Sequence, residues 1–191
     1  MGSHSEYQKM LAGELYNASD PELIELRMRA RKLLTAYNQL PFDRALRQLS
    51  ITGLLGKIGD NVDIQTPFFC DYGLHIEAGD NFFANFNCIF LDCNYIRIGN
   101  NVFLGPLVQI YTAYHPLEAV DRIKGPELAG SVNIGDNVWI GGGAIICAKV
   151  NIGSNTTIGA GSVVTRNIPS NVFAAGNPCR VIKTLIDGRG S

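Results

Sequence analysis

Apolar residues recur at every sixth position along much of the chain. Between Ile134 and Val164 every sixth residue is isoleucine or valine, at positions 134, 140, 146, 152, 158 and 164. The residue that follows is often glycine, and the fifth position of each hexapeptide is mostly small or β-branched. Strands of a β-sandwich, the alternative, alternate with period two and do not keep a six-residue frame over this length. The pattern therefore predicts a parallel β-helix, in which each hexapeptide forms one flat side and glycine allows the tight corners.

The same six-residue frame is present upstream, in blocks that begin at Ile58, Ala78 and Ile98. Between blocks the frame slips by two residues, so their starts are 20 residues apart. We expect residues 58–168 to form a mostly β domain of about five coils, interrupted by an inserted loop at residues 116–131. The segment 169–187 is predicted to form a C-terminal tail.

Residues 6–57 lack the six-residue frame and have helical patterns instead. The stretch S-D-P-E at residues 19–22 combines a capping residue, a proline for the first turn and a carboxylate near the positive helix end. It predicts a helix over residues 23–40. A second start at Asp43 predicts a helix that runs toward residue 56, and a short helix is expected near residues 7–11. The sequence thus predicts a small helical region ahead of the β-helix.

Composition narrows the classes of partner. The 16 lysine and arginine residues nearly balance 17 aspartate and glutamate residues, which argues against a nucleic-acid or membrane-surface partner bound through bulk charge. No apolar stretch approaches the roughly 18 residues of a membrane-spanning helix. The five cysteines are odd in number and contain no C-x-x-C pair, so neither a disulfide framework nor a zinc knuckle is indicated. We therefore expect a reduced, cytoplasmic protein.

Several short motifs resemble those of one enzyme family. They are M-L-A-G-E-L-Y at residue 10, C-D-Y-G at 70, F-F-A-N-F-N at 82, T-A-Y-H-P at 112, N-V-W-I-G-G-G at 137 and A-A-G-N-P-C-R-V-I-K at 174. Together they resemble the maltose and galactoside O-acetyltransferases over residues 10–183, with the maltose branch more similar. The resemblance implies a left-handed β-helix and a cytoplasmic homotrimer. It also implies transfer of an acetyl group from acetyl-coenzyme A to a sugar hydroxyl, as on maltose, glucose or a galactoside.

The family's functional positions can be carried over to the matching residues of this chain. The resemblance implies that His115 is the catalytic base, and that Asn85 both stabilises the charge of the reaction and contacts the sugar. It implies coenzyme contacts at Trp139, Gly142, Ala160, Thr165, Arg166, Arg180 and Lys183, and further sugar contacts at Asp71 and Arg27. The galactoside enzymes have a serine where Gly142 stands, and carboxylates where Ala18 and Cys93 stand here. These departures concern the identity of the acceptor rather than the reaction.

The chemistry requires a base for the alcohol proton, a donor for the oxyanion and a coenzyme held in line. A lone histidine is more often a satisfied structural group, but His115 stands where the repeat breaks into a long insertion. The backbone N–H near Gly142 could serve the oxyanion, although glycines at a corner can also serve only the turn. Trp139, the single tryptophan, falls at an outward position, which is typical of an interface or a ligand wall. The cations near the C-terminus could bind phosphates or simply face solvent.

The repeat frame also predicts where the site forms. His75, Tyr95 and His115 are 20 residues apart, so we expect them to stack in one column at one corner. Asn85 and Trp139 belong to a different corner. His115 and Asn85 can then share a site only between two chains, which predicts a cyclic trimer with three shared sites.

Other functions fit parts of the sequence. A hexapeptide-repeat carbonic anhydrase would share a metal among histidines, but His75 and His115 are two coils apart, about 10 Å at roughly 4.8 Å per coil. We therefore expect no metal. An antibiotic could replace the sugar as acceptor on the same scaffold, although the helical opening favours sugars. A non-catalytic trimeric scaffold would require neither His115 nor affinity for the coenzyme.

Overall fold

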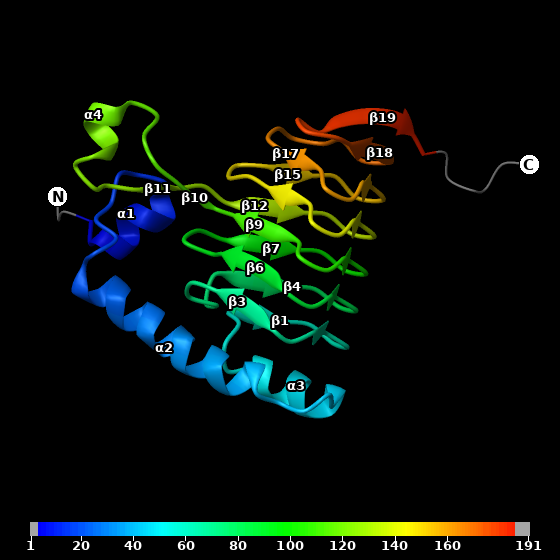
Figure 1. Ribbon diagram of the computed structural model, residues 1–191, viewed down its shortest axis with the longest axis horizontal. Helices are drawn as coiled ribbons and strands as arrows, with labels where there is room; N and C mark the ends of the chain where they lie inside the picture. Colours follow the sequence, from blue (N-terminus) through cyan, green and yellow to red (C-terminus); the bar gives the residue numbers. More distant parts are fainter. Residues whose placement is uncertain (1–3, 186–191) are drawn as a thin grey trace, which may run out of the picture.

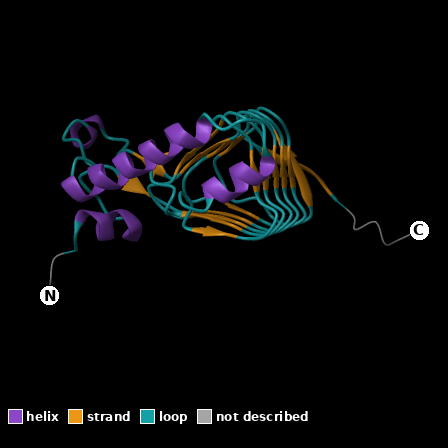
Figure 2. Cartoon of the chain, turned by 90° about the horizontal axis from the view of Figure 1, so that it is seen from below, coloured by secondary structure: helices purple, strands orange, loops and turns teal. Residues whose placement is uncertain are grey.

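The computed structural model describes residues 4–185, in which three parallel sheets form the sides of a triangular prism, seen from the side in Figure 1 and from below in Figure 2. The first side contains β1 (Lys57–Ile58), β4 (Ile76–Ala78), β7 (Ile96–Ile98), β12 (Val132–Ile134) and β15 (Asn151–Ile152). The second contains β2 (Asp63–Ile64), β5 (Phe83–Ala84), β8 (Phe103–Leu104), β13 (Trp139–Ile140), β16 (Thr157–Ile158), β18 (Val172–Ala175) and β19 (Arg180–Thr184). The third contains β3 (Phe68–Cys70), β6 (Cys88–Leu91), β9 (Gln109–Tyr111), β14 (Ile145–Ile146) and β17 (Val163–Val164).

Strand register confirms the hexapeptide prediction. Ile134 pairs with Ile152, Ile140 with Ile158, and Ile146 with Val164, each in parallel register. The frame residues are buried and belong to one core that runs through the prism. Each coil therefore places the same aliphatic side chain over its counterpart in the next, and a parallel β-helix buries them all.

Parallel pairing continues beyond residue 168, into the segment predicted to be a tail. Strand β18 pairs in parallel with β16, with Ile158 opposite Ala174, and so begins a sixth turn. These two positions are 16 residues apart rather than 18, so a strict six-residue frame misses the strand. At the end of this sheet β19 pairs antiparallel with β18.

An asparagine ladder lines the corner between the first and second sides. Its members, which share a left-handed backbone with φ between 55° and 59°, are Asn61, Asn81, Asn101, Asn137, Asn155 and Asn171. Each amide Nδ2 donates to the Oδ1 of the next asparagine, at 2.9 to 3.2 Å. Asparagine tolerates this conformation better than other residues with a side chain, and the ladder satisfies its amides from coil to coil.

The N-terminal region consists of α1 (Glu6–Ala12), α2 (Pro21–Asn38) and α3 (Arg44–Ile51). Asp20 and Asp43 cap α2 and α3 through their side chains, as predicted. Helix α3 ends five residues before Gly56, because the chain there already enters the first coil. A Cβ on Gly56 would lie 2.0 Å from the carbonyl oxygen of Leu74, so the two backbones are in tight contact. Helix α3 lies at the base of the prism (Figure 1).

The inserted loop leaves the prism as a two-stranded antiparallel ribbon, β10 (Ala113–Tyr114) and β11 (Leu128–Ala129), with α4 (Ala119–Arg122) between them. It lies beside α1, away from the prism axis (Figures 1 and 2). A second hydrophobic cluster, separate from the prism core, joins the loop to the N-terminal region and contains Met10, Tyr16, Leu23, Tyr72, Cys93 and Ala129. Among the described residues, 4–185, no helix is long and apolar enough to cross a membrane.

Candidate functional site

Five of the predicted site residues fall at the two corners that bound the third side of the prism. Asn85, Gly142 and Ala160 lie at the corner between the second and third sides, which we call the second–third corner. Asp71 and Thr165 directly follow strands β3 and β17 at the opposite edge, the third–first corner. Within one chain, the third side therefore separates the two groups.

The second–third corner is built around a column of glycines. The paired strand residues of successive coils are followed at this corner by Asn85, Gly105 and Gly141. A Cβ on Gly105 would lie 2.5 Å from the backbone nitrogen of Gly142. A side chain there would push the next coil away, so the backbones approach closely only because glycine is present. In residues 4–185 no hydrogen bond uses the Gly142 N–H, which leaves this donor available at the corner.

Asn85 is oriented by its own backbone neighbour. Its Oδ1 accepts a hydrogen bond from the N–H of Phe86 at 2.8 Å. The Nδ2 amide is thereby turned away from this contact and can donate to a ligand. Two donors of the kind that stabilise an oxyanion, the Asn85 amide and the Gly142 N–H, thus occupy the same corner.

Trp139 is on β13 and faces outward, with 57% of its surface exposed. In register it lies between Phe103 and Thr157. The outward position matches the prediction. The predicted coenzyme cations are also exposed: Arg166 follows β17, whereas Arg180 and Lys183 are on β19.

The third–first corner carries a column that links the two kinds of predicted contact. Each member comes directly after a strand residue that is paired in parallel register with its counterpart in the next coil. The members are Asp71, Leu91, Tyr111, Cys147 and Thr165. Asp71, a predicted sugar contact, is at one end, and Thr165, a predicted coenzyme contact, is at the other. A ligand that spans the column would reach both.

Asp71 borders a pocket of about 290 Å³ between α2 and the third side, lined also by Arg31, Thr35, Asn38 and Phe69. Burial raises the pKa of Asp71, while a hydrogen bond from the Cys93 thiol at 3.6 Å and the nearby Arg31 and Arg27 oppose the rise. The pocket combines charged, hydroxyl and amide groups with an aromatic edge. Such a set can bind a ligand that carries several hydroxyl groups.

The predicted column of His75, Tyr95 and His115 is wrong in its last member. The rings of His75 and Tyr95 do lie together, with centroids 5.7 Å apart. However, the Val132 N–H donates to the Tyr95 carbonyl, so Ser131 takes the next place in the column. The chain leaves the prism at Thr112, three residues before His115, because the ribbon β10–β11 begins within the expected coil.

His115 is exposed and follows β10 at the root of the loop. It borders a groove of about 740 Å³ that is also lined by Leu15, Tyr114, Glu118, Lys124 and Lys149. Lys149 lies over the Tyr114 ring, with Nζ 4.8 Å from the centroid. The imidazole is therefore open to a ligand or to a second chain that approaches this corner.

The loop is fastened to the N-terminal region near its return strand. Tyr16 and Glu127 exchange backbone hydrogen bonds of 3.1 and 3.0 Å. The Tyr16 hydroxyl also donates to the Glu127 carboxylate at 2.8 Å. Sequence reasoning missed this pair, since no motif links two residues that are 111 positions apart.

Two segments of the chain match known sequence families. Residues 9–59 match the maltose acetyltransferase hexapeptide capping motif, and residues 131–166 match the bacterial transferase hexapeptide of six repeats. A maltose O-acetyltransferase from Clostridium difficile 630 is 48% identical, with a TM-score of 0.95 over 97% of this chain and 100% of that one. The chain belongs to the maltose and galactoside O-acetyltransferase family. It is an acetyltransferase, as the motifs predicted.

Other members of the family resemble this acetyltransferase over nearly their whole length. Nodulation protein L of Rhizobium meliloti is 47% identical over 94% of this chain and 98% of its own. A galactoside acetyltransferase in complex with coenzyme A is 36% identical, with a TM-score of 0.93 over 97% of this chain and 93% of that one. The similarity therefore includes the N-terminal region, the prism and the inserted loop together.

The departures from the galactoside branch have local consequences in this acetyltransferase. Gly142 keeps its backbone donor although it lacks the serine side chain. Cys93 is buried, and burial raises the pKa of its thiol, so it stays neutral and donates to Asp71. Ala18 offers its carbonyl to Arg27 at 2.6 Å. Within residues 4–185 no group of three or more His, Cys, Asp and Glu side chains is placed to hold a metal ion.

Proposed function

We propose that this enzyme transfers the acetyl group of acetyl-coenzyme A to a hydroxyl of a sugar, in a homotrimer whose sites form between neighbouring chains. The observation that carries the proposal is the division of the site between two corners. The two candidate oxyanion donors lie at the second–third corner, whereas the polar pocket around Asp71 lies at the third–first corner and His115 lies on the ribbon that leaves the prism there. If a second prism packed against the third side, the candidate donors of one chain could meet His115 and the Asp71 pocket of its neighbour.

In this mechanism His115 takes the proton of the acceptor hydroxyl as the oxygen attacks the thioester carbonyl. The resulting oxyanion accepts hydrogen bonds from the Asn85 amide and from the Gly142 N–H. The carbon–sulfur bond then breaks, the acetyl group remains on the acceptor oxygen, and the proton held by His115 passes to the coenzyme A sulfur. Trp139 and Ala160 border the coenzyme arm, with Thr165 of the opposite corner beside it. Arg166, Arg180 and Lys183 bind its phosphates.

The acceptor occupies the pocket beside Asp71, where Arg27 is also held nearby through Tyr72. Several hydrogen-bonding side chains around one aromatic edge favour a sugar over a largely apolar antibiotic. Buried, unpaired thiols such as Cys70 and Cys88 fit a reducing compartment, so we place the enzyme in the cytoplasm.

The first test measures coenzyme A release from acetyl-coenzyme A with maltose, glucose, galactosides and chloramphenicol as acceptors. We expect sugar-dependent release that falls about 10²- to 10⁴-fold in His115→Ala, the usual contribution of a general base. Ile123→Ala, an exposed change in the same loop, controls for damage to the loop and should keep wild-type activity. Coenzyme A release with chloramphenicol and with none of the sugars would show that the acceptor is an antibiotic and not a sugar. No release, together with no coenzyme binding, would favour a non-catalytic scaffold.

Shared sites can be tested by mixing two inactive variants. His115→Ala and Asn85→Ala protomers, unfolded and refolded together in equal amounts, should recover about a quarter of the wild-type activity, because random mixing leaves one interface in four with both native residues. Each variant refolded alone is the control. Mixed samples that stay inactive, or an active monomer in sedimentation, would refute a site between chains.

A further inference from the structure

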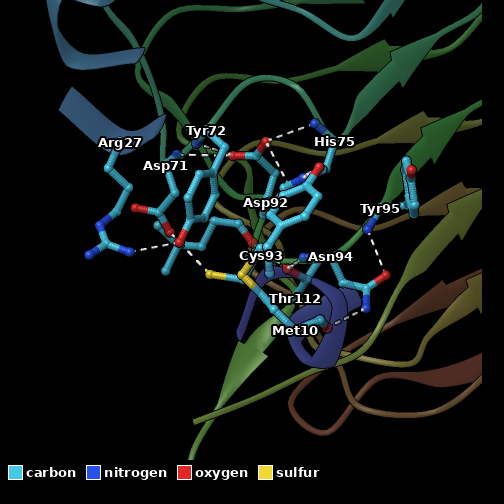
Figure 3. A network of polar contacts seen from close by, with 12 residues as sticks. Met10, Arg27, Asp71, Tyr72, His75, Asp92, Cys93, Asn94, Tyr95 and Thr112 are labelled. Atoms are coloured by element: carbon cyan, nitrogen blue, oxygen red, sulfur yellow. Dashed lines mark hydrogen bonds and ion pairs between the residues drawn. The ribbon is translucent and has the colours of Figure 1, made fainter. Parts of the chain in front are cut away.

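Asp92 is a fully buried carboxylate at the third–first corner, directly after β6 (Figure 3). Its Oδ1 accepts hydrogen bonds from the backbone N–H groups of Asp71 at 3.0 Å and Tyr72 at 2.8 Å. Its Oδ2 accepts from the N–H of His75 at 3.3 Å. One side chain thus satisfies three backbone donors of a single turn, residues 71–75.

This turn holds two of the three side chains proposed to contact the sugar, Asp71 and Arg27 (Figure 3). Asp71 is its first residue. Arg27 comes from α2, and its Nη1 donates to the Tyr72 hydroxyl at 2.7 Å. Gly73 has a φ of +74°, and a Cβ there would lie 2.5 Å from the Leu54 carbonyl oxygen, so the turn is also closely packed from below. A displacement of the turn would therefore move both sugar contacts together.

The far end of the turn is fixed by His75, which is also buried. Its Nδ1 lies 2.6 Å from the Asp92 carbonyl oxygen and must donate to it, so Nε2 accepts from the Tyr7 hydroxyl at 3.1 Å. Helix α1 is joined to the same place, since Asn94 donates to the carbonyls of Met10 and Leu11. The N-terminal region therefore closes over the turn that Asp92 organises.

Closing a coil does not by itself require such a group. At the exposed corner between the first and second sides, Asp136 accepts the N–H of Asn100 at 2.7 Å. One coil away, Asn100 accepts the N–H of Asp80 in the same way at 2.8 Å. A neutral amide thus does the same work as a carboxylate there. A buried carboxylate bonded to three amides is a costlier arrangement, and it is found where the acceptor pocket begins.

We propose that Asp92 is a positioning residue for the acceptor, which holds Asp71 and the Tyr72-bound Arg27 in the geometry that binds the sugar. This inference rests on the proposed function, because it assumes that these two side chains contact the acceptor. Asp92 itself lies behind the pocket and touches no reacting atom. Its effect should therefore appear in binding of the acceptor and not in binding of the coenzyme.

The test is steady-state kinetics of Asp92→Asn at pH 8, with acceptor and coenzyme varied separately. Asparagine would place an N–H₂ group against one of the backbone donors, so at least one hydrogen bond to a charged group is lost. We expect the KM for the sugar to rise roughly 10- to 100-fold while the KM for acetyl-coenzyme A stays within about twofold. Asp136→Asn is the matched control and should change neither constant. Equal changes in both constants for Asp92→Asn would overturn the proposal.

A second measurement separates positioning from general damage. In a background that already lacks both contacts, Arg27→Met with Asp71→Asn, adding Asp92→Asn should lower kcat/KM for the sugar by less than about threefold. A further loss as large as in the wild-type background would overturn the proposal. If Asp92→Asn does not fold, Tyr72→Phe is the second variant, because it releases only Arg27. We expect it to raise the KM for the sugar about tenfold. An unchanged KM would overturn the proposal. A wild-type enzyme that acetylates no sugar would instead refute the proposed function itself.

Discussion

The buried carboxylate of Asp92 makes the stability of this enzyme depend on pH in an unusual direction. Burial raises the pKa of Asp92 to about 7, more than the N–H donors of Tyr72 and His75 can offset. The unfolded chain has the ordinary value of 3.8. Because the folded pKa is the higher one, the folded state binds the proton more tightly. Stability is then fully present below the unfolded pKa and is lost as pH rises through about 7.

The magnitude follows from the linkage between proton binding and folding. Between pH 3.8 and 7 the folded chain holds one proton that the unfolded chain has released, which changes stability by about 1.4 kcal/mol per pH unit. Because the folded carboxyl is half protonated at pH 7, lowering the pH from 7 to 5 should raise the free energy of unfolding by about 2 kcal/mol through Asp92 alone. His75 has the opposite effect. Burial lowers its pKa, so its contribution to the stability of the folded protein is lost as pH falls below the ordinary histidine pKa of 6.5.

The contribution of Asp92 can be isolated as a difference between two proteins. Urea unfolding of wild type and Asp92→Asn, at pH 5, 6, 7 and 8 and at one protomer concentration, gives the stability difference at each pH. His75 is present in both proteins, and so its titration largely cancels. We expect the wild type to gain about 2 kcal/mol on the variant between pH 7 and pH 5, and to lose less than about 0.5 kcal/mol between pH 7 and 8.

A flat difference between pH 5 and 7 would refute this reasoning. It would mean that three backbone donors hold the carboxylate ionised in spite of its burial. A difference that rises with pH would place the folded pKa below that of the unfolded chain and would assign the hydrogen bonds the larger effect.

Other changes test the scaffold around the site. Arg47 is 2% exposed and bonded to Asp63 at 3.0 Å, so Asp63→Ala should leave a buried charge unpaired and lower the free energy of unfolding by about 3–5 kcal/mol in denaturant titrations. Gly105→Ala should push the Gly142 nitrogen out of place and cost about 1–3 kcal/mol in stability. The loss of coenzyme binding free energy in calorimetric titration should be larger than this cost. Asn137→Ala removes two ladder bonds and a residue suited to a φ of 56°, and should cost about 1–3 kcal/mol in thermal unfolding without a change in kcat.

Periodicity predicted the part of the fold that repeats and failed where the repeat ends. The buried stacking of Ile134 on Ile152 and of Ile140 on Ile158 follows from the six-residue frame alone, because each coil imposes the same environment on the same position. Strand β18 was missed because its coil is two residues shorter. The corner asparagines were also missed, since a pattern of apolar positions carries no information about the polar residues that take a left-handed backbone.

The site was predictable only where a residue's role is fixed by the coil. The frame alone assigns Asn85 and Trp139 to one corner and predicts that Trp139 faces outward, as it does. It placed His115 wrongly, because the ribbon β10–β11 leaves the prism before the histidine is reached. The proposed positioning role of Asp92 could not be predicted from the sequence, because it depends on three backbone N–H donors that only the folded turn brings together.

The two hydrophobic clusters indicate why this family keeps an N-terminal region ahead of its repeat. The prism core fixes columns of residues with the spacing of the coils, and this is sufficient for the proposed coenzyme contacts at a corner. The proposed acceptor pocket cannot be built in this way, because its residues come from α2 as well as from the third side of the prism and the turn after β3. The second cluster packs these pieces together around Tyr16 and Tyr72. Substitutions in that cluster should therefore alter the choice and binding of the acceptor first, whereas substitutions in the prism core should weaken the whole enzyme.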